Sequence, residues 1–140
     1  MAKDKRCVLV VEDDLDATEI MGEILESLGY TCRIARSGSE AIAMAGELRP
    51  DIVMLDIALP DVSGFEVARR LREAPGGGAV WIMALTGYSD AAHRDRAFAS
   101  GFDRYLVKPI TISTLERAMN EPAPARATQA ARSVPAPQAL

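Results

Sequence analysis

The sequence predicts an α/β fold whose core is a doubly wound parallel β-sheet. Short apolar runs of strand length recur along the chain, and the strongest are rich in Val, Ile and Leu without polar alternation. That composition is typical of parallel strands covered by helices on both faces. Helical patterns lie between these runs, so that strands and helices alternate through five successive units. The 140 residues are ample for one core of this kind and too few for two.

Five segments are expected to form the strands of this sheet. Four of them are apolar runs, and the second along the chain is a weaker run that alternates in polarity. In chain order, the predicted strands cover residues 7–11, 31–35, 52–55, 80–85 and 105–107. Because a helical pattern follows each strand, the connections are expected to be right-handed crossovers between parallel strands.

The first two helices are predicted from their apolar faces and their end signals. Apolar residues keep one face over residues 15–28, and Gly29 suits the left-handed backbone that follows a helix end. A second apolar face covers residues 41–48 and ends before Pro50, which cannot continue a helix.

Three further helices follow in the second half of the chain. The third is marked by apolar residues within 67–71 and is closed by the Pro-Gly-Gly-Gly run at 75–78. The fourth is Ala-rich and covers residues 90–100. The spacing of Ser113 and Glu116 is that of a capping box and predicts a short fifth helix, which ends before Pro122. The arginines of the third helix are expected to form a solvated face: Arg69, Arg70 and Arg72.

Charge and composition exclude several classes of function. The 16 Lys and Arg residues against 20 Asp and Glu residues give a net charge of −4, which argues against binding to nucleic acid. No apolar run approaches the ~20 residues that span a bilayer. The first apolar run stops at Glu12, too early for a signal peptide. Two cysteines fit a reducing cytosol, so we expect a cytoplasmic protein without membrane insertion.

The amino-acid composition of the chain changes after the fifth predicted helix. Prolines lie among Ala, Arg, Gln and Ser over residues 121–140. Such a segment cannot bury enough apolar surface to offset the entropy lost on ordering. We therefore expect a disordered Pro/Ala-rich tail over 121–140.

Polar side chains follow the predicted strands at the edge of the sheet where ligands bind in such folds. They comprise an acidic cluster after the first strand, a carboxylate after the third, a hydroxyl after the fourth and an ammonium after the fifth: Glu12, Asp13 and Asp14, then Asp56, Thr86 and Lys108. If the first and third strands are neighbours, their ends lie about 4.8 Å apart. Asp13 and Asp56 would then reach the same small cation.

This set of side chains suits phosphoryl chemistry. Crowded carboxylates repel one another, and a hard divalent cation such as Mg²⁺ relieves that repulsion with oxygen ligands. A carboxylate beside Mg²⁺ and a lysine is a plausible nucleophile toward a phosphoryl group and would give an aspartyl-phosphate. Lys108 and Thr86 would then stabilise the transferring oxygens.

These residues lie in four motifs that together resemble the signature of a two-component response-regulator receiver domain. The motifs are Val8-Leu9-Val10-Val11-Glu12-Asp13-Asp14, Leu55-Asp56-Ile57-Ala58-Leu59-Pro60 with Gly64, Ala84-Leu85-Thr86-Gly87, and Val107-Lys108-Pro109. The resemblance covers roughly residues 5–120, which we take as the receiver domain. It implies a flavodoxin-like (βα)5 fold with strand order 2-1-3-4-5. It also implies transfer of a phosphoryl group from a sensor histidine kinase or a histidine phosphotransfer protein, and output through a downstream protein target.

The resemblance also implies a role for individual residues. Asp56 matches the phosphoacceptor, and Glu12 and Asp13 match the acidic pair that binds Mg²⁺ with it. The Ala58 carbonyl matches a further metal ligand. Two more positions match groups that hold the phosphoryl oxygens, Thr86 and Lys108. Tyr105 matches the aromatic switch position, whose ring turns inward when Thr86 moves toward the phosphate.

Some positions depart from the commonest receiver pattern. Glu12 replaces the more frequent Asp, and Ile110 replaces a frequent aromatic residue. Ala58 and Tyr88 lie two residues beyond Asp56 and Thr86, where receivers often carry polar groups near the hydrolytic water. An alanine cannot orient that water, so we predict slow loss of the phosphoryl group.

Two other functions remain open as alternatives. A phosphatase of the haloacid-dehalogenase type also uses an Asp nucleophile with Mg²⁺, but it needs a second Asp at the position of Ala58. A non-phosphorylated binding module of the same fold would be favoured only if Asp56 or Lys108 were absent. We expect a signalling receiver that promotes only its own phosphorylation and dephosphorylation. It belongs either to a single-domain regulator or to a hybrid histidine kinase.

Overall fold

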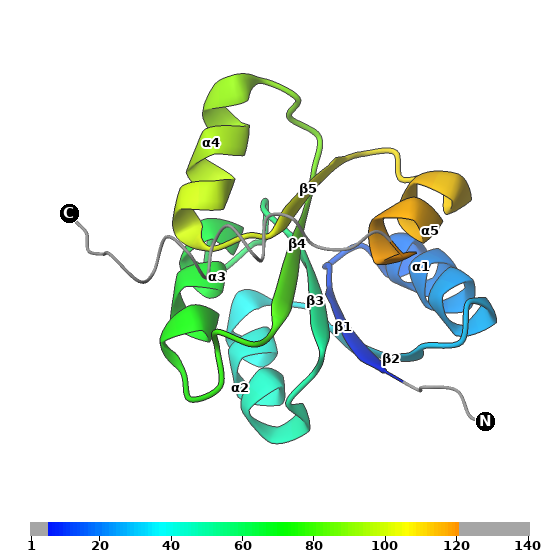
Figure 1. The fold of residues 1–140 in the computed structure, drawn as a ribbon, viewed down its shortest axis with the longest axis horizontal. Coiled ribbons are helices and arrows are strands. Elements are labelled where there is room, and N and C mark those ends of the chain that lie inside the picture. The colour runs from blue at the N-terminus through cyan, green and yellow to red at the C-terminus, as the bar shows by residue number, and fades with distance from the viewer. Residues whose placement is uncertain (1–5, 121–140) are drawn as a thin grey trace.

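The structure is a computed structural model and describes residues 6–120. Its elements alternate strictly between strand and helix (Figure 1). In chain order they are β1 Cys7–Val11, α1 Leu15–Ser27, β2 Thr31–Ala35, α2 Gly38–Leu48, β3 Ile52–Asp56, α3 Gly64–Glu73, β4 Trp81–Thr86, α4 Ala91–Ser100, β5 Arg104–Val107 and α5 Ile112–Asn120. The predicted tail over 121–140 lies outside the described residues. Within 6–120 no helix has the length and apolar character needed to cross a membrane.

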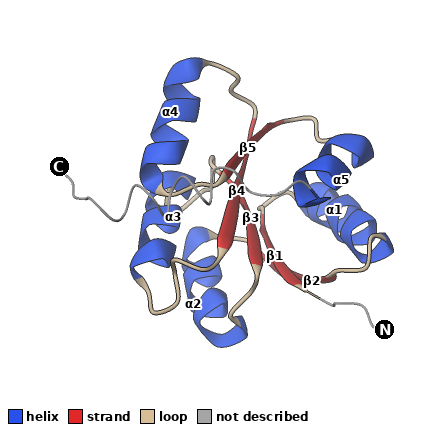
Figure 2. Ribbon diagram, viewed as in Figure 1, coloured by secondary structure: helices blue, strands red, loops and turns tan. Residues whose placement is uncertain are grey.

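All five strands join one parallel sheet in the order β2-β1-β3-β4-β5. The predicted fold class and strand order are therefore confirmed. Helices α1 and α5 cover one face of the sheet, and α2, α3 and α4 cover the other (Figure 2). The chain order reverses at β1, so the carboxyl ends of β1 and β3 lie side by side. This edge is where a ligand site is expected.

Both faces of the central strands are buried, which explains their unbroken apolar sequences. Leu9 and Val11 pack into the core beneath α2, α3 and α4. Val8 and Val10, on the alternate face, pack into the core beneath α1 and α5. Since side chains alternate along a strand, a strand covered on both faces needs apolar residues at every position.

Two strands are one residue longer at their carboxyl ends than the apolar pattern predicted. β3 ends at Asp56 and β4 ends at Thr86, so both polar side chains occupy the last position of a strand. Both are almost completely buried, at 5% and 2% exposure. The strand ladder therefore fixes the backbone of these two residues at the edge of the sheet where a ligand site is expected.

The predicted start of the fifth helix at Ser113 is wrong. The hydroxyl of Thr111 accepts a hydrogen bond from the Thr114 amide at 3.1 Å, so Thr111 caps a helix that begins at Ile112. Thr and Ser are both good caps, and tertiary packing decides between them. The observed start places the buried positions Leu115, Ala118 and Met119 on one face toward the sheet.

The predicted solvated face of α3 is wrong for one of its arginines. Arg69 and Arg70 are exposed as expected, and both pair with Glu66. The side chain of Arg72 is only 13% exposed, and its guanidinium lies 2.6 Å from the buried carboxylate of Asp103, just before β5. Arg72 also donates hydrogen bonds to the carbonyls of the loops on either side: Gly77, Val80 and Gly101. It joins the end of α3 to the α4–β5 turn.

Candidate functional site

Three carboxylates meet at the carboxyl ends of β1 and β3. One oxygen from each of Glu12, Asp13 and Asp56 lies within 4.8 Å of the others. The register pairs Val11 with Leu55, so the residues that follow are brought to the same edge of the sheet. Glu12 and Asp56 are 4% and 5% exposed, whereas Asp13 is exposed to solvent. Two carboxylates of the cluster are thus buried, and the third lies on a side that is open to a ligand.

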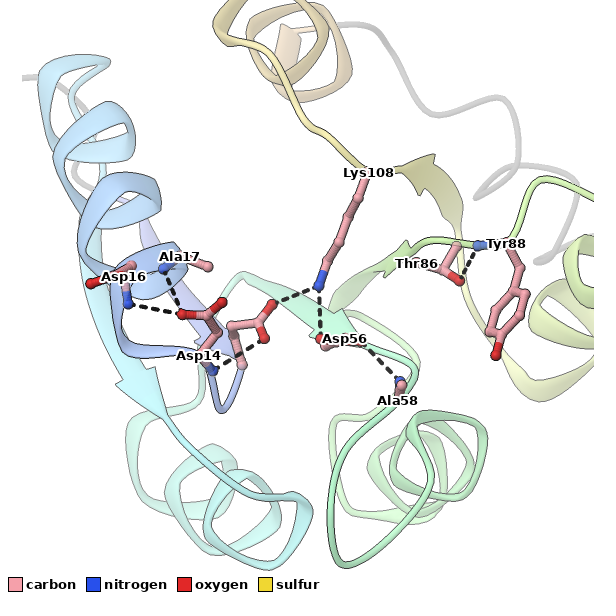
Figure 3. Close-up of polar contacts among 9 residues, drawn as sticks. Asp14, Asp16, Ala17, Asp56, Ala58, Thr86, Tyr88 and Lys108 are labelled. Atoms are coloured by element: carbon pink, nitrogen blue, oxygen red, sulfur yellow. Dashed lines mark hydrogen bonds and ion pairs between the residues drawn. The ribbon is translucent and has the colours of Figure 1, made fainter.

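The neighbouring acid Asp14 has a different task. Its Oδ1 accepts hydrogen bonds from the amides of Asp16 and Ala17, and it caps the N-terminus of α1 (Figure 3). A capping carboxylate satisfies amides that would otherwise lack an acceptor. The acidic run after β1 therefore divides into two site residues and one structural cap.

Lys108 supplies a positive charge to the two buried carboxylates. Its Nζ donates to Glu12 Oε1 at 2.9 Å and to Asp56 Oδ2 at 2.9 Å (Figure 3). Burial alone would lower the pKa of Lys108, but the ion pairs with Asp56 and Glu12 outweigh it and raise that pKa. The ammonium therefore stays protonated and remains available at the carboxylate of Asp56.

The charge of the cluster is not fully balanced by one lysine. Burial raises the pKa of Glu12, and the neighbouring Asp56 adds to that rise, while the hydrogen bond from Lys108 opposes it. A buried carboxylate that resists ionisation in this way is stabilised by a nearby cation. The donor set consists of carboxylate oxygens, which are the ligands that Mg²⁺ and Ca²⁺ prefer. The residues present therefore fit a hard divalent cation.

The loop after β3 is held tightly against the end of the strand. The Ala58 amide donates to Asp56 Oδ1 at 2.9 Å, and the Gly64 amide donates to the Ile57 carbonyl at 2.9 Å. A Cβ at Gly64 would lie 2.6 Å from the Ile57 Cα, so only glycine fits this approach. The loop thus fixes one oxygen of Asp56 with a backbone amide, and the other faces Lys108.

Thr86 lies at the same edge, but its hydroxyl is engaged elsewhere. Thr86 Oγ1 accepts a hydrogen bond from the Tyr88 amide at 3.0 Å (Figure 3). Among the contacts of residues 6–120, none joins this hydroxyl to Asp56 or Lys108. The Thr86 carbonyl accepts from the Lys108 amide at 2.7 Å, so the two residues occupy neighbouring strand ends. The structure therefore gathers Glu12, Asp13, Asp56 and Lys108, with Thr86 next to them but turned to its own loop.

Tyr105 is linked to Thr86 through Tyr88. The Tyr105 hydroxyl donates to the Tyr88 carbonyl at 2.6 Å, and its half-buried ring packs against the core beneath α2, α3 and α4. The ring of Tyr88 stacks on His93, with centroids 4.1 Å apart and an interplanar angle of 3°. Asp90 caps α4 and contacts the His93 ring nitrogen at 2.7 Å.

The sequence did not predict that Tyr88 would contact Thr86, Tyr105 and His93. The Asp90–His93 spacing is the single available signal, since it is typical of a helix start. Nothing in the sequence indicates that the ring of Tyr88 would stack on that first turn or that its carbonyl would accept from Tyr105.

The fold and the site together define a class of protein: a doubly wound α/β domain with a buried acidic cluster and a lysine where its parallel strands end. Comparison with known proteins gives the family. The model of the response regulator receiver domain matches residues 8–120. The chain belongs to this family, whose members are signalling modules of two-component systems.

The relatives of the chain include single-domain regulators and parts of kinases. The polar-differentiation response regulator DivK of Brucella anthropi is 32% identical over 107 residues, covering 76% of this chain and 87% of DivK. The sensor histidine kinase AtsR of Burkholderia thailandensis is 39% identical over 111 residues, covering 76% of this chain but 18% of the kinase.

A solved structure shows a similar fold. It is the receiver domain of the sensor histidine kinase PA1611 from Pseudomonas aeruginosa PAO1, with a magnesium ion coordinated in its active site cleft. The TM-score is 0.77 at 29% identity, and the match covers 83% of this chain and 95% of that chain.

Proposed function

We propose that Asp56 accepts a phosphoryl group from the phosphohistidine of a sensor histidine kinase or histidine phosphotransfer protein. The observation that carries this proposal is the surroundings of the Asp56 carboxylate. It is buried, it lies 2.9 Å from Lys108 Nζ, and it shares a cluster with Glu12 and Asp13. A carboxylate beside a fixed ammonium is placed for nucleophilic attack on phosphorus.

Magnesium is the cation proposed for the cluster. Carboxylate oxygens of Glu12, Asp13 and Asp56 would hold it, with the Ala58 carbonyl as a further ligand. The magnesium in the PA1611 receiver supports this assignment. Bound there, Mg²⁺ would neutralise charge on the phosphoryl oxygens.

The side chains of this chain have definite tasks in the transfer. An Asp56 oxygen forms a bond to phosphorus while the phosphorus–nitrogen bond to the donor histidine breaks, and the imidazole leaves with the electron pair of that bond. Lys108 pairs with a phosphoryl oxygen as its contact with Asp56 is replaced. Thr86 donates a hydrogen bond from its hydroxyl to another phosphoryl oxygen after it turns away from the Tyr88 amide.

Output follows from the movement of Thr86. Phosphorylation adds charge that Lys108 and Thr86 pair with, which favours a second arrangement of the β4–α4 loop. Tyr105 is bonded to that loop through the Tyr88 carbonyl, so its ring would turn inward as the loop shifts. A structure with bound beryllofluoride tests this coupling. A structure in which the Tyr105 ring still points outward and Thr86 has not moved would contradict it.

The phosphorylated form is proposed to be long-lived. The Ala58 side chain has no polar group to orient an attacking water. Tyr88, two residues beyond Thr86, carries an aromatic ring that stacks on His93. Decay of purified phosphoprotein in Mg²⁺ measures the lifetime. A half-life of seconds would show that water is oriented by some other group.

The test of the proposed function is incubation with acetyl phosphate and Mg²⁺, followed by measurement of the intact mass. We expect a gain of one phosphoryl group that disappears in Asp56→Asn. Asp16→Asn serves as a matched control, because Asp16 is an acid of the first turn of α1 outside the cluster. Loss of the gain in both variants, or in neither, would contradict the assignment of Asp56.

The same experiment separates the phosphatase alternative. Steady hydrolysis of a phosphoester beyond one turnover would support that enzyme. The structure favours the receiver, because the position of the required second carboxylate is Ala58, whose amide is bonded to Asp56.

A further inference from the structure

Asp61 connects the loop that follows the phosphoacceptor to a different helix. It lies between β3 and α3, and its carboxylate reaches the N-terminus of α2. Oδ1 accepts from the Gly38 amide at 2.8 Å, and Oδ2 accepts from the Ser39 amide at 3.0 Å and the Ser39 hydroxyl at 2.7 Å. These bonds join residues more than twenty positions apart in the chain.

These hydrogen bonds stabilise the ionised form of the Asp61 carboxylate. Hydrogen bonds from the Ser39 hydroxyl, the Gly38 amide and the Ser39 amide lower the pKa of Asp61 well below its ordinary value. Asp61 therefore stays ionised to a lower pH than a free aspartate does. A negative charge at the N-terminus of a helix also interacts favourably with the helix dipole.

The helix does not need Asp61 in order to begin. α2 has its own cap, Ser37, whose hydroxyl accepts from the Glu40 amide at 3.1 Å. The contact from Asp61 is thus additional to normal capping. What it changes is the placement of the loop, which it binds to the helix end.

The packing beneath this contact is tight. A Cβ at Gly38 would lie 2.8 Å from Val67 Cγ2 and 2.9 Å from Val62 Cβ, so the loop and the first residues of α3 rest directly on the α2 backbone. The absence of a side chain at Gly38 lets Val62, the neighbour of Asp61, lie against the start of α2.

Both segments joined by Asp61 continue into the acidic cluster. The β3–α3 loop starts at Asp56 and includes Ala58, whose amide fixes Asp56 Oδ1. On the other side, the Ala35 carbonyl just before α2 accepts from the Glu12 amide at 3.0 Å. Asp61 therefore joins the loop that follows Asp56 to the segment after β2, and the end of β2 is hydrogen-bonded to the Glu12 amide.

We propose that Asp61 is a positioning residue for the metal site, which holds the β3–α3 loop so that Asp56 and the Ala58 carbonyl stay at the distance a divalent cation requires. This inference rests on the proposed function for the identity of the site. Groups that orient metal ligands from outside the coordination shell commonly contribute tenfold or more to metal affinity.

The test compares Asp61→Ala with Ser37→Ala, which removes the other cap of the same helix end. The dissociation constant of Mg²⁺ is measured by calorimetry on the unphosphorylated full chain. We expect Asp61→Ala to bind Mg²⁺ about tenfold more weakly and Ser37→Ala to bind it as the unaltered protein does. The amides of Gly38 and Ser39 should exchange hydrogen faster in Asp61→Ala. Raising Mg²⁺ to saturation should restore the rate of phosphorylation.

A second variant keeps the test decisive if Asp61→Ala is destabilised as a whole. Asp61→Asn keeps one oxygen for the Gly38 amide, and we expect its Mg²⁺ affinity to lie between those of Asp61→Ala and the unaltered protein. Unchanged affinity in both Asp61 variants, or equal weakening in Ser37→Ala, would overturn the inference. A failure of the unaltered protein to take a phosphoryl group would refute the proposed function. The comparison of Mg²⁺ affinities would still decide the role of Asp61.

Discussion

Replacing Lys108 by methionine should make the folded protein depend on an added cation. The substitution keeps much of the apolar stem and removes the ammonium between Glu12 and Asp56. Those two carboxylates are 4% and 5% exposed, so neither can turn out to water without disturbing the ends of β1 and β3. Two buried carboxylates would then face each other without the ammonium that pairs with both of them.

The size of the effect follows from burial. Removing one partner of a buried ion pair costs about 3–5 kcal/mol, because the other charge is left uncompensated. The side chain of Lys108 is 37% exposed, so water already screens part of its attraction to the carboxylates. We therefore expect Lys108→Met to lower the free energy of unfolding by about 2 kcal/mol at pH 8 without Mg²⁺.

Urea unfolding at several pH values, with and without Mg²⁺, measures this. Losing the ammonium should raise the pKa of Glu12 further. Acidification should then protonate Glu12 in the variant and reduce the difference in free energy of unfolding between the variant and the unaltered protein. Saturating Mg²⁺ should also reduce the difference in free energy of unfolding between Lys108→Met and the unaltered protein at pH 8. Arg69→Met is the control, since its pair with Glu66 is exposed and contributes less than about 1 kcal/mol. If the difference in free energy of unfolding changed with neither pH nor Mg²⁺, the electrostatic explanation would be refuted.

Three further outcomes are expected. Asp103→Ala leaves the buried guanidinium of Arg72 without its carboxylate, and urea unfolding should show a loss of about 3–5 kcal/mol. Burial raises the pKa of Cys32 from 9.0 to about 11, so at pH 8 its alkylation by iodoacetamide, followed by mass spectrometry, should be about 100-fold slower than in urea. Burial also raises the pKa of Glu12, so its contribution to stability is present below pH 4.5 and declines as pH rises through the folded pKa. Glu12→Gln should flatten that decline in unfolding curves recorded without Mg²⁺.

The fold was predictable because its strands carry a strong signal. The run from Val8 to Val11 has no polar position, and the structure buries all four residues on the two faces of the sheet. The main site residues were predictable for a related reason. Parallel strands end at one edge, so residues that follow them, such as Asp56 and Lys108, meet there whatever the details of the helices.

Contacts between loops were not predictable, because no local pattern specifies them. Arg72 follows two solvated arginines and has the same chemistry, yet the return of the chain at Gly101 and Asp103 buries it. Asp61 similarly reads as an ordinary turn residue. Its partners on α2 are determined by the way two crossover connections pack, which depends on the whole fold.

The link between Thr86 and Tyr105 also follows from such loop contacts. The Tyr88 amide donates to Thr86, and the Tyr88 carbonyl accepts from Tyr105, so one peptide segment connects both side chains. A partly buried amide that loses its acceptor costs about 1–3 kcal/mol, so Thr86 cannot turn toward a phosphoryl group unless this amide finds another partner. We therefore expect the backbone at Tyr88 to move with Thr86, which would weaken the hydrogen bond to Tyr105 and disturb the stacking of the Tyr88 ring on His93. The switch is thus expected to involve the whole β4–α4 loop as one unit, because its hydrogen bonds leave no single side chain free to move alone.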